Sequence, residues 1–355
     1  MSTWRLLDTG LRPAAENMAM NRAILEAHQA GEAPPTLRFL RFSPCALVGF
    51  HQSVAQELDV AFCREQGIAI QRRMTGGGAI YFDETQLGWE LYFDRHWLGA
   101  AEMESVARRV CEAAAAGISK LGVDARFRPR NDIEVDGRKL SGTGGAFDGD
   151  AILYQGTLLL DFDVERMFRV LRIPAEKLSN KAIESARDRV VNLSTLLGQV
   201  PTLSTVHQAM AEGFSEAFGM TFEPSEQLNA REQERFAEAL AEIDSDEWVY
   251  QRNAPVNERD VLTALHKSEG GLIRASLRLD TAGRHVRQLW FTGDFFVQPR
   301  RLINDLEAYL KERRIDELAQ HVDAFFASYG AHDLLQLRPE DFQRALAGAL
   351  AQRAE

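Results

Sequence analysis

The sequence predicts an α+β protein built on a mixed β-sheet, and three features carry that prediction. Short strand-like runs such as "TLRFLRF" (36–42) and "AILYQGTLLLDFD" (151–163) are closed by turns. They alternate irregularly with helical stretches, which argues against regular βαβ winding. The pair Asp136-Gly137 between the extended arms of "NDIEVDGRKLSG" is a strong signal for a β-hairpin.

The individual elements follow from local periodicity. The stretch 16–29 is expected to be a helix, because apolar residues recur at helical spacing. Strand-like "CALVGF" (45–50), a short helical stretch around Cys63 and "GIAIQRRM" (67–74) come next. A strong amphipathic helix is predicted over 102–121, and Cys111 beside its apolar stripe is expected in the core. That stripe consists of Met103, Val106, Val110, Ala114, Ile118 and Leu121.

Two domains are expected, with a boundary near residue 245. A chain of 355 residues suits two domains. The charged helical stretch 229–248 gives way to the turn-rich "RNAPVNERD" (252–260), a hairpin at 272–291 and three helices. We therefore predict a first domain over 1–245 and a small α+β domain over 246–355.

Composition excludes several classes of function. A net charge of −11 argues against broad nucleic-acid binding, which needs a basic footprint. No apolar run approaches the ~20 residues that span a bilayer, and the N-terminal stretch lacks a signal pattern, so we expect a cytoplasmic protein without membrane contact. Three cysteines without metal-ligand spacing predict neither a disulfide framework nor a zinc site, which fits a reducing compartment.

The segment "RRMTGGGAIYFD" (72–83) is the first candidate binding element. Three consecutive glycines let the backbone adopt positive φ, and their N–H groups can converge on a bound oxyanion. Arg72 and Arg73 add charge and bidentate phosphate recognition. The spacing matches neither a Walker loop nor a dinucleotide-binding fingerprint. The alternative is a tight turn between two strands.

The second candidate is "NDIEVDGRKLSGTGG" (131–145). Its hairpin turn places Lys139 two residues into the return strand, just before Ser141 and a run of small residues. A lysine there could act as a point charge on a phosphate or carboxylate. The alternative is a solvated strand lysine.

Together these two segments resemble the lipoate-protein ligase A family. The first is similar to its Arg-Arg-x-Ser/Thr-Gly-Gly-Gly-Ala motif, and "RNDIEVDGRKLSG" is similar to its Asn-Asp followed by Gly-Arg-Lys-hydrophobic-Ser/Ala-Gly. Supporting stretches occur in the family's order at 37–59, 154–163 and 181–198. The segment 289–310 looks like the accessory domain of the longer ligases, so the resemblance covers nearly the whole chain.

The resemblance implies a biotin/lipoate ligase-like catalytic domain with a mobile C-terminal accessory domain. It implies that lipoate and ATP, with Mg²⁺, give lipoyl-AMP and pyrophosphate. The lipoyl group then passes to a lysine of a carrier, a lipoyl domain of a 2-oxoacid dehydrogenase complex or the glycine cleavage H protein. Charge that builds on the α-phosphate is of the kind that preorganised N–H groups and a lysine stabilise.

The resemblance also assigns site residues. Lys139 is the catalytic candidate, and no covalent enzyme intermediate is required. His51, Gln52 and Phe82 are candidates for the acyl pocket. The ATP and lipoyl-adenylate candidates are Arg72, Arg73, Thr75, Gly76, Gly77, Gly78, Ala79, Asn131, Asp132, Ser141, Gly142, Gly156 and Thr157. Arg187 and Arg189 lie in an adenylate-proximal segment of the family or, alternatively, on a helix surface.

Two alternatives remain open. Octanoyl- and lipoyl-transferases of similar layout use a cysteine a few residues ahead of the Gly-Arg-Lys segment, but the stretch 126–142 holds none. The second alternative is a non-catalytic homologue that binds a lipoyl group or a nucleotide. It is kept open by Phe82 and Gln155, which stand where the family has histidines, and by Asn21 in place of a frequent aspartate. We expect Phe82 to be a core replacement.

Overall fold

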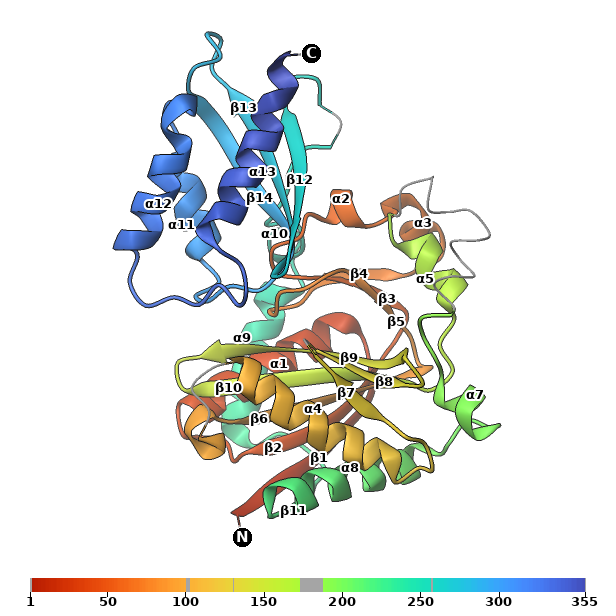
Figure 1. Cartoon of the computed structure of the whole chain (residues 1–355). Coiled ribbons are helices and arrows are strands. Elements are labelled where there is room, and N and C mark those ends of the chain that lie inside the picture. The colour runs from red at the N-terminus through yellow and green to blue at the C-terminus, as the bar shows by residue number, and fades with distance from the viewer. Residues whose placement is uncertain (1, 100–102, 130, 173–187, 257, 355) are drawn as a thin grey trace.

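An eight-stranded mixed β-sheet forms the centre of the N-terminal part of the protein (Figure 1). The computed structural model describes residues 2–99, 103–129, 131–172, 188–256 and 258–354. The sheet order is β11-β1-β2-β6-β10-β9-β8-β7. The first three of these strands pair in parallel and the others antiparallel, so the predicted α+β fold with a mixed sheet is confirmed. The strands are β1 (Ser2–Arg12), β2 (Thr36–Phe42), β6 (Gln86–Asp94), β7 (Arg126–Arg128), β8 (Asp132–Val135), β9 (Arg138–Asp148), β10 (Ala151–Leu159) and β11 (Met220–Ser225).

Helices cover both faces of this sheet. In β2, Arg38 contacts Asn17 of α1, whereas the next residue, Phe39, stacks on His207 of α8. Because successive strand residues point to opposite faces, α1 and α8 lie on opposite sides of the sheet. Helix α9 packs beside α1, and α4 packs beside α8 (Figure 1). These helices are α1 (Ala14–Gln29), α4 (Met103–Ser119), α8 (Leu203–Phe218) and α9 (Ala230–Ile243).

A second, three-stranded sheet carries the glycine segment. Its order is β4-β3-β5, and β3 pairs parallel with β4 and antiparallel with β5. The chain therefore leaves β4, crosses through residues 73–79 and returns on the other side of β3. The elements of this region are β3 (Cys45–Val48), α2 (Val54–Glu57), α3 (Val60–Glu65), β4 (Ala69–Arg72) and β5 (Ile80–Phe82).

The C-terminal part has its own sheet and its own hydrophobic core. The predicted hairpin and three helices are confirmed, and one further strand precedes them. Helix α10 (Asp246–Val249) still packs against β4, and the exact boundary at 245/246 stays a prediction. The elements are β12 (Leu262–Ser268), β13 (Gly271–Leu279), β14 (Val286–Phe295), α11 (Leu302–Leu310), α12 (Leu318–Ser328) and α13 (Pro339–Ala351). Two short helices, α5 (Val164–Val170) and α7 (Leu193–Leu197), follow the strand β10 in the N-terminal part.

Candidate active site

The glycine segment forms a loop between β4 and β5 in which Arg73 binds the backbone from within. The Arg73 Nη2 donates to the carbonyl oxygens of Gly76 and Gly78, both at 2.8 Å, and its Nε donates to Thr75 Oγ1 at 3.1 Å. Burial lowers the pKa of Arg73 to about 10, so the guanidinium remains charged at neutral pH. Gly77 has φ +91°, a conformation that side chains rarely adopt.

The Arg72 side chain holds backbone segments together, and its assignment to nucleotide binding stays a prediction. Its guanidinium is 0% exposed and donates to five backbone carbonyls. Those carbonyls belong to Gly49, Phe50, Gln52, Trp248 and Val249. Arg72 therefore ties the loop after β3 to α10, and burial lowers its pKa to about 9.

The end of β14 lies directly against the glycine loop. Gly77 N–H donates to the Phe295 carbonyl at 3.1 Å. A Cβ on Gly76 would lie 2.3 Å from the same oxygen, so only glycine permits this approach. The Phe296 ring lies between Gly77 and Gly144 of β9. A Cβ added to Gly77 would lie 3.0 Å from this ring, and a Cβ added to Gly144 would lie 3.4 Å from it. The C-terminal part thus closes over the loop.

His51 and Gln52 also belong to this contact. The His51 ring stacks on Phe295 with centroids 4.9 Å apart, and its carbonyl accepts from Gly293 N–H at 3.1 Å. Burial and the nearby arginines hold the pKa of His51 well below its ordinary value. Gln52 Oε1 accepts from Gly49 N–H at 2.9 Å. Both side chains are buried, and their assignment to the edge of an acyl pocket stays a prediction.

Lys139 lies on the strand after the predicted hairpin turn, whose residues Asp136 and Gly137 have φ 51° and 74°. Its Nζ is 2.7 Å from Asp132 Oδ1, and its side chain is 40% exposed. A Cβ on Gly142 would lie 2.8 Å from the same Nζ, so Gly142 provides room for the ammonium group. The lysine is therefore held in place by a carboxylate and is not a freely solvated strand residue.

One face of strands β9 and β10 lies toward the loop and includes the predicted residues Gly142 and Thr157. Gly144 contacts the Phe296 ring, which in turn contacts the loop. Gln155 is the cross-strand partner of Gly144, and its Nε2 donates to Thr75 Oγ1 at 3.1 Å. Thr157 Oγ1 accepts from Gly142 N–H at 3.3 Å. The structure thus gathers Thr75, the glycines and the Lys139 strand on one face of the sheet.

Ser141 and Gly156 point to the opposite face of the sheet, and their assignment to the ligand site stays a prediction. Ser141 is 0% exposed and shares its strand face with Thr143, which contacts Cys111 of α4. A Cβ on Gly156 would lie 2.3 Å from the Trp89 ring. Position 156 requires glycine because the Trp89 ring occupies the space of any side chain there.

The other predicted residues have local partners. Asn131 Nδ2 donates to the Thr143 carbonyl at 2.6 Å and so fastens the start of the hairpin. Phe82 is 4% exposed and packs on Phe42 with ring centroids 4.6 Å apart, as expected of a core replacement. The Arg189 carbonyl accepts from Lys139 N–H at 2.8 Å. Ala79 packs at the edge of the main hydrophobic core, and Arg187 lies outside the described residues.

A buried charged network under this face was not predicted. Arg38 of β2, Glu90 of β6 and Gln155 of β10 are successive cross-strand partners. Glu90 is 2% exposed and accepts hydrogen bonds from Arg38, Tyr92 and Asn21. The signal in the sequence was a single carboxylate inside the apolar run "LGWELYF" (87–93). This network anchors the row that ends at Gln155.

All three cysteines, Cys45, Cys63 and Cys111, are 0% exposed. Burial raises the pKa of Cys63 to about 11 and raises the pKa values of the other two thiols. Cys111 Sγ lies 3.3 Å from Thr143 Oγ1 and 3.4 Å from Tyr154 OH. The expected core positions of Cys63 and Cys111 are confirmed.

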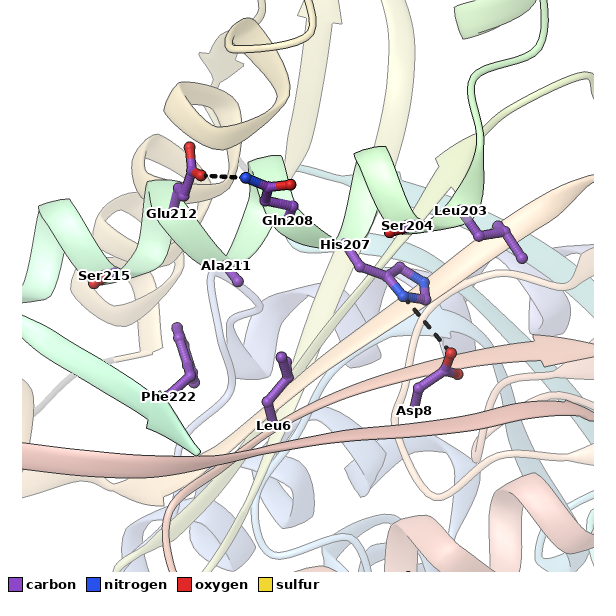
Figure 2. A pocket seen from close by; sticks show the side chains of 10 residues that line it. All are labelled: Leu6, Asp8, Leu203, Ser204, His207, Gln208, Ala211, Glu212, Ser215 and Phe222. Atoms are coloured by element: carbon purple, nitrogen blue, oxygen red, sulfur yellow. Dashed lines mark hydrogen bonds and ion pairs between the residues drawn. The ribbon is translucent and has the colours of Figure 1, made fainter. Parts of the chain in front are cut away.

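A cavity of about 610 Å³ lies on the other face of the sheet, between β1, β11 and α8 (Figure 2). His207 Nδ1 is 3.6 Å from Asp8 Oδ2 there, and Gln208 donates to Glu212. None of the predicted site residues lines this cavity. It is therefore separate from the candidate active site.

Among the described residues, no three His, Cys, Asp or Glu side chains gather in a way that could hold a metal ion. None of the helices in the described ranges is both long and apolar enough to cross a membrane.

Comparisons with known proteins find a family model and relatives that match most of the N-terminal part of the chain. The family model described as the lipoyl protein ligase A/B catalytic domain matches residues 13–215. The octanoyltransferase LipM of Kyrpidia tusciae is 34% identical over 276 residues, covering 71% of this chain and 100% of the relative. The octanoyltransferase LipM of Bacillus subtilis is 28% identical and covers 70% of this chain and 99% of its own.

Solved structures extend the likeness. A bi-partite lipoate protein ligase from Thermoplasma acidophilum, described with its E2 lipoyl domain, has a TM-score of 0.65 at 27% identity, covering 73% of this chain and 100% of that one. A lipoate-protein ligase A bound with ATP has a TM-score of 0.61 at 26% identity, covering 70% and 98%. Plasmodium falciparum LipL1 shares the fold over 98% of this chain and 99% of its own, with a TM-score of 0.74 at 17% identity. The chain therefore belongs to the lipoyl protein ligase A/B catalytic domain family, which includes lipoate-protein ligases and octanoyltransferases.

Proposed function

We propose that this protein attaches a medium-chain acyl group, lipoyl or octanoyl, to a lysine of a lipoyl domain. Family membership supports this reaction class. The names of the relatives support the acyl group, since they are octanoyltransferases and lipoate ligases. The Thermoplasma acidophilum ligase, described with its E2 lipoyl domain, supports the kind of acceptor.

We propose further that the acid is activated with ATP as an acyl-adenylate. The observation that carries this route is the burial of all three thiols, each 0% exposed with a raised pKa. A thioester intermediate on the enzyme needs an accessible thiolate. An adenylate needs none, because AMP is itself the leaving group when the carrier lysine attacks the acyl carbonyl.

The geometry of the loop supports binding of an oxygen ligand. Gly77 N–H donates to the carbonyl oxygen of Phe295 at 3.1 Å, so this N–H is oriented to donate to an oxygen atom outside the loop. In the adenylation step a carboxylate oxygen attacks the α-phosphate and pyrophosphate leaves. Lys139 and the loop N–H groups are suited to stabilise the charge of that transition state.

A second candidate is an octanoyltransferase that takes its acyl group from a thioester-linked carrier. The curated relatives favour it, since LipM octanoyltransferases match 70–71% of this chain. In that reaction the carrier thiol leaves and the acceptor lysine takes the acyl group without ATP. The missing cysteine ahead of Lys139 and the burial of the three thiols weigh against a route through the enzyme's own thiol.

One experiment separates the two routes. A lipoyl domain is incubated with the protein and either octanoate, ATP and Mg²⁺ or octanoyl-acyl carrier protein without ATP, and its mass is measured. A lipoyl domain whose acceptor lysine is replaced by arginine is the control. Acylation from the free acid supports the ligase, and acylation only from the thioester supports the transferase. Acylation from neither donor, with lipoate also tested, would contradict the proposed function.

A further inference from the structure

The Thr75 hydroxyl lies at a junction between the glycine loop and the sheet. Its Oγ1 receives a hydrogen bond from Arg73 Nε at 3.1 Å and another from Gln155 Nε2 at 3.1 Å. Thr75 is only 2% exposed, so bulk water does not compete freely for this oxygen. The two donors reach it from different elements, since Arg73 follows β4 and Gln155 belongs to β10.

The direction of these hydrogen bonds determines what the hydroxyl can still do. A hydroxyl oxygen has two acceptor lone pairs and one O–H donor, and the guanidinium Nε–H can only donate. With both lone pairs occupied, the Thr75 proton must be directed elsewhere. In the described part of the chain no oxygen accepts it. A buried O–H without an acceptor is costly, so this position is suited to a ligand oxygen.

We infer that Gln155 is a positioning residue that fixes the Thr75 hydroxyl as a hydrogen-bond donor toward an anionic oxygen of the substrate. This inference rests on the proposed function. The positive charge of Arg73, whose Nε donates to this hydroxyl, favours a negatively charged oxygen, either of the acyl carboxylate or of a nucleotide phosphate. Gln155 is itself held in the row that continues through Glu90 to Arg38.

The inference explains why glutamine can replace the histidine that the family resemblance led us to expect at position 155. Both side chains can present an N–H to Thr75 from the same strand position. A carboxylate of the same size cannot, because it only accepts. Gln155→Glu would therefore turn the hydroxyl away from the ligand, so that Thr75 donates to the new carboxylate instead.

The test measures the affinities of octanoate and of ATP by calorimetry in four variants and the wild type. Gln155→Glu and the uncharged Gln155→Met should weaken one of the two ligands by about 10- to 100-fold, the usual worth of a hydrogen bond to a charged group. Weaker octanoate binding would identify the oxygen as that of the acyl carboxylate, and weaker ATP binding would identify it as that of a phosphate. Gln155→His should stay within about threefold of wild type, since it restores a donor. Gln288→Glu, on the exposed side of β14, is the control for the added charge.

The Gln155→Met variant keeps the test valid if Gln155→Glu folds poorly beside Glu90, and melting temperatures report folding for each variant. Wild-type affinities in Gln155→Met, or a loss in Gln155→His as large as that in Gln155→Met, would overturn the inference. If the wild-type protein binds neither octanoate, lipoate nor ATP, the proposed function itself fails, and the inference fails with it.

Discussion

Lys139 and Arg72 show how far single residues could be assigned from the sequence. The hairpin turn placed Lys139 correctly, because Asp136-Gly137 fixes the register of the strand that carries it. Arg72 was predicted to bind a ligand, but its partners are carbonyls at 49–52 and 248–249. Sequence patterns do not reveal such distant backbone partners, and so they could not distinguish it from Arg73.

Replacing Lys139 by alanine should abolish adenylate formation with little effect on stability. The lost ion pair with Asp132 is half exposed, and such pairs stabilise a fold by about 0–1 kcal/mol. Loss of a preorganised charge at a transition state lowers the rate by roughly 10²-fold or more. Trapping of octanoyl-adenylate with hydroxylamine measures the rate. Lys120→Ala, which removes a 2.8 Å ion pair with Glu216, is the control and should remain active.

The buried thiols should be dispensable for chemistry. We expect Cys45→Ala, Cys63→Ala and Cys111→Ser combined to lower stability by about 1–3 kcal/mol per site while leaving acyl transfer within a few-fold of wild type. Denaturant melts and carrier acylation are the two measurements. A folded triple variant that no longer acylates the carrier would instead support a thioester route through one of these residues.

Among the helices and strands, segments whose apolar residues recur with a clear period were predicted correctly, and a segment without such a period was missed. The amphipathic helix predicted over 102–121 is α4, with Val106, Val110, Ala114 and Ile118 buried. Strand β6 was not predicted, because its first eight residues are all buried and the run has no alternation. That strand carries Glu90, so the charged network beneath the site was missed with it.

Two glycines near the site should respond in opposite ways to substitution. Gly77→Val places a β-branched side chain at φ +91°, against Arg73 and Phe296, and should abolish octanoate and ATP binding. Gly156→Ala pushes a methyl group against Trp89 on the far face and should cost about 1–3 kcal/mol while preserving binding. Calorimetry on folded protein and denaturant melts separate the two effects. Normal binding by Gly77→Val would mean that the loop is scaffold.

At the scale of the whole molecule, the C-terminal part lies where a ligand would approach. The Phe295 carbonyl accepts the hydrogen bond of Gly77 N–H, and the Phe296 ring lies between Gly77 and Gly144. Figure 1 shows the C-terminal unit standing over the small sheet that carries this loop. The sequence suggested two domains, but the contact between them depends on residues more than 200 positions apart, which no local pattern encodes.

A reversible crosslink between the two parts should block the site. A Cβ on Gly78 would lie 3.3 Å from the Asp294 Cγ, so cysteine side chains at these two positions would lie close enough to be tested for a disulfide. We expect the oxidised Gly78→Cys/Asp294→Cys variant to lose binding of octanoate and ATP. Reduction of the disulfide should restore binding in the double variant. The two single variants, which cannot form the disulfide, are the controls and should bind both ligands. Binding by the oxidised form equal to that of the reduced form would show that the contact is compatible with substrate.

Isotope exchange between pyrophosphate and ATP reports whether the protein activates the free acid as an adenylate. The reversible first step requires neither a carrier domain nor an enzyme thiol. We expect exchange that depends on octanoate or lipoate, persists in the triple cysteine variant and disappears in Lys139→Ala. Absence of acid-dependent exchange in wild-type protein that transfers octanoyl groups from a thioester donor would contradict this expectation.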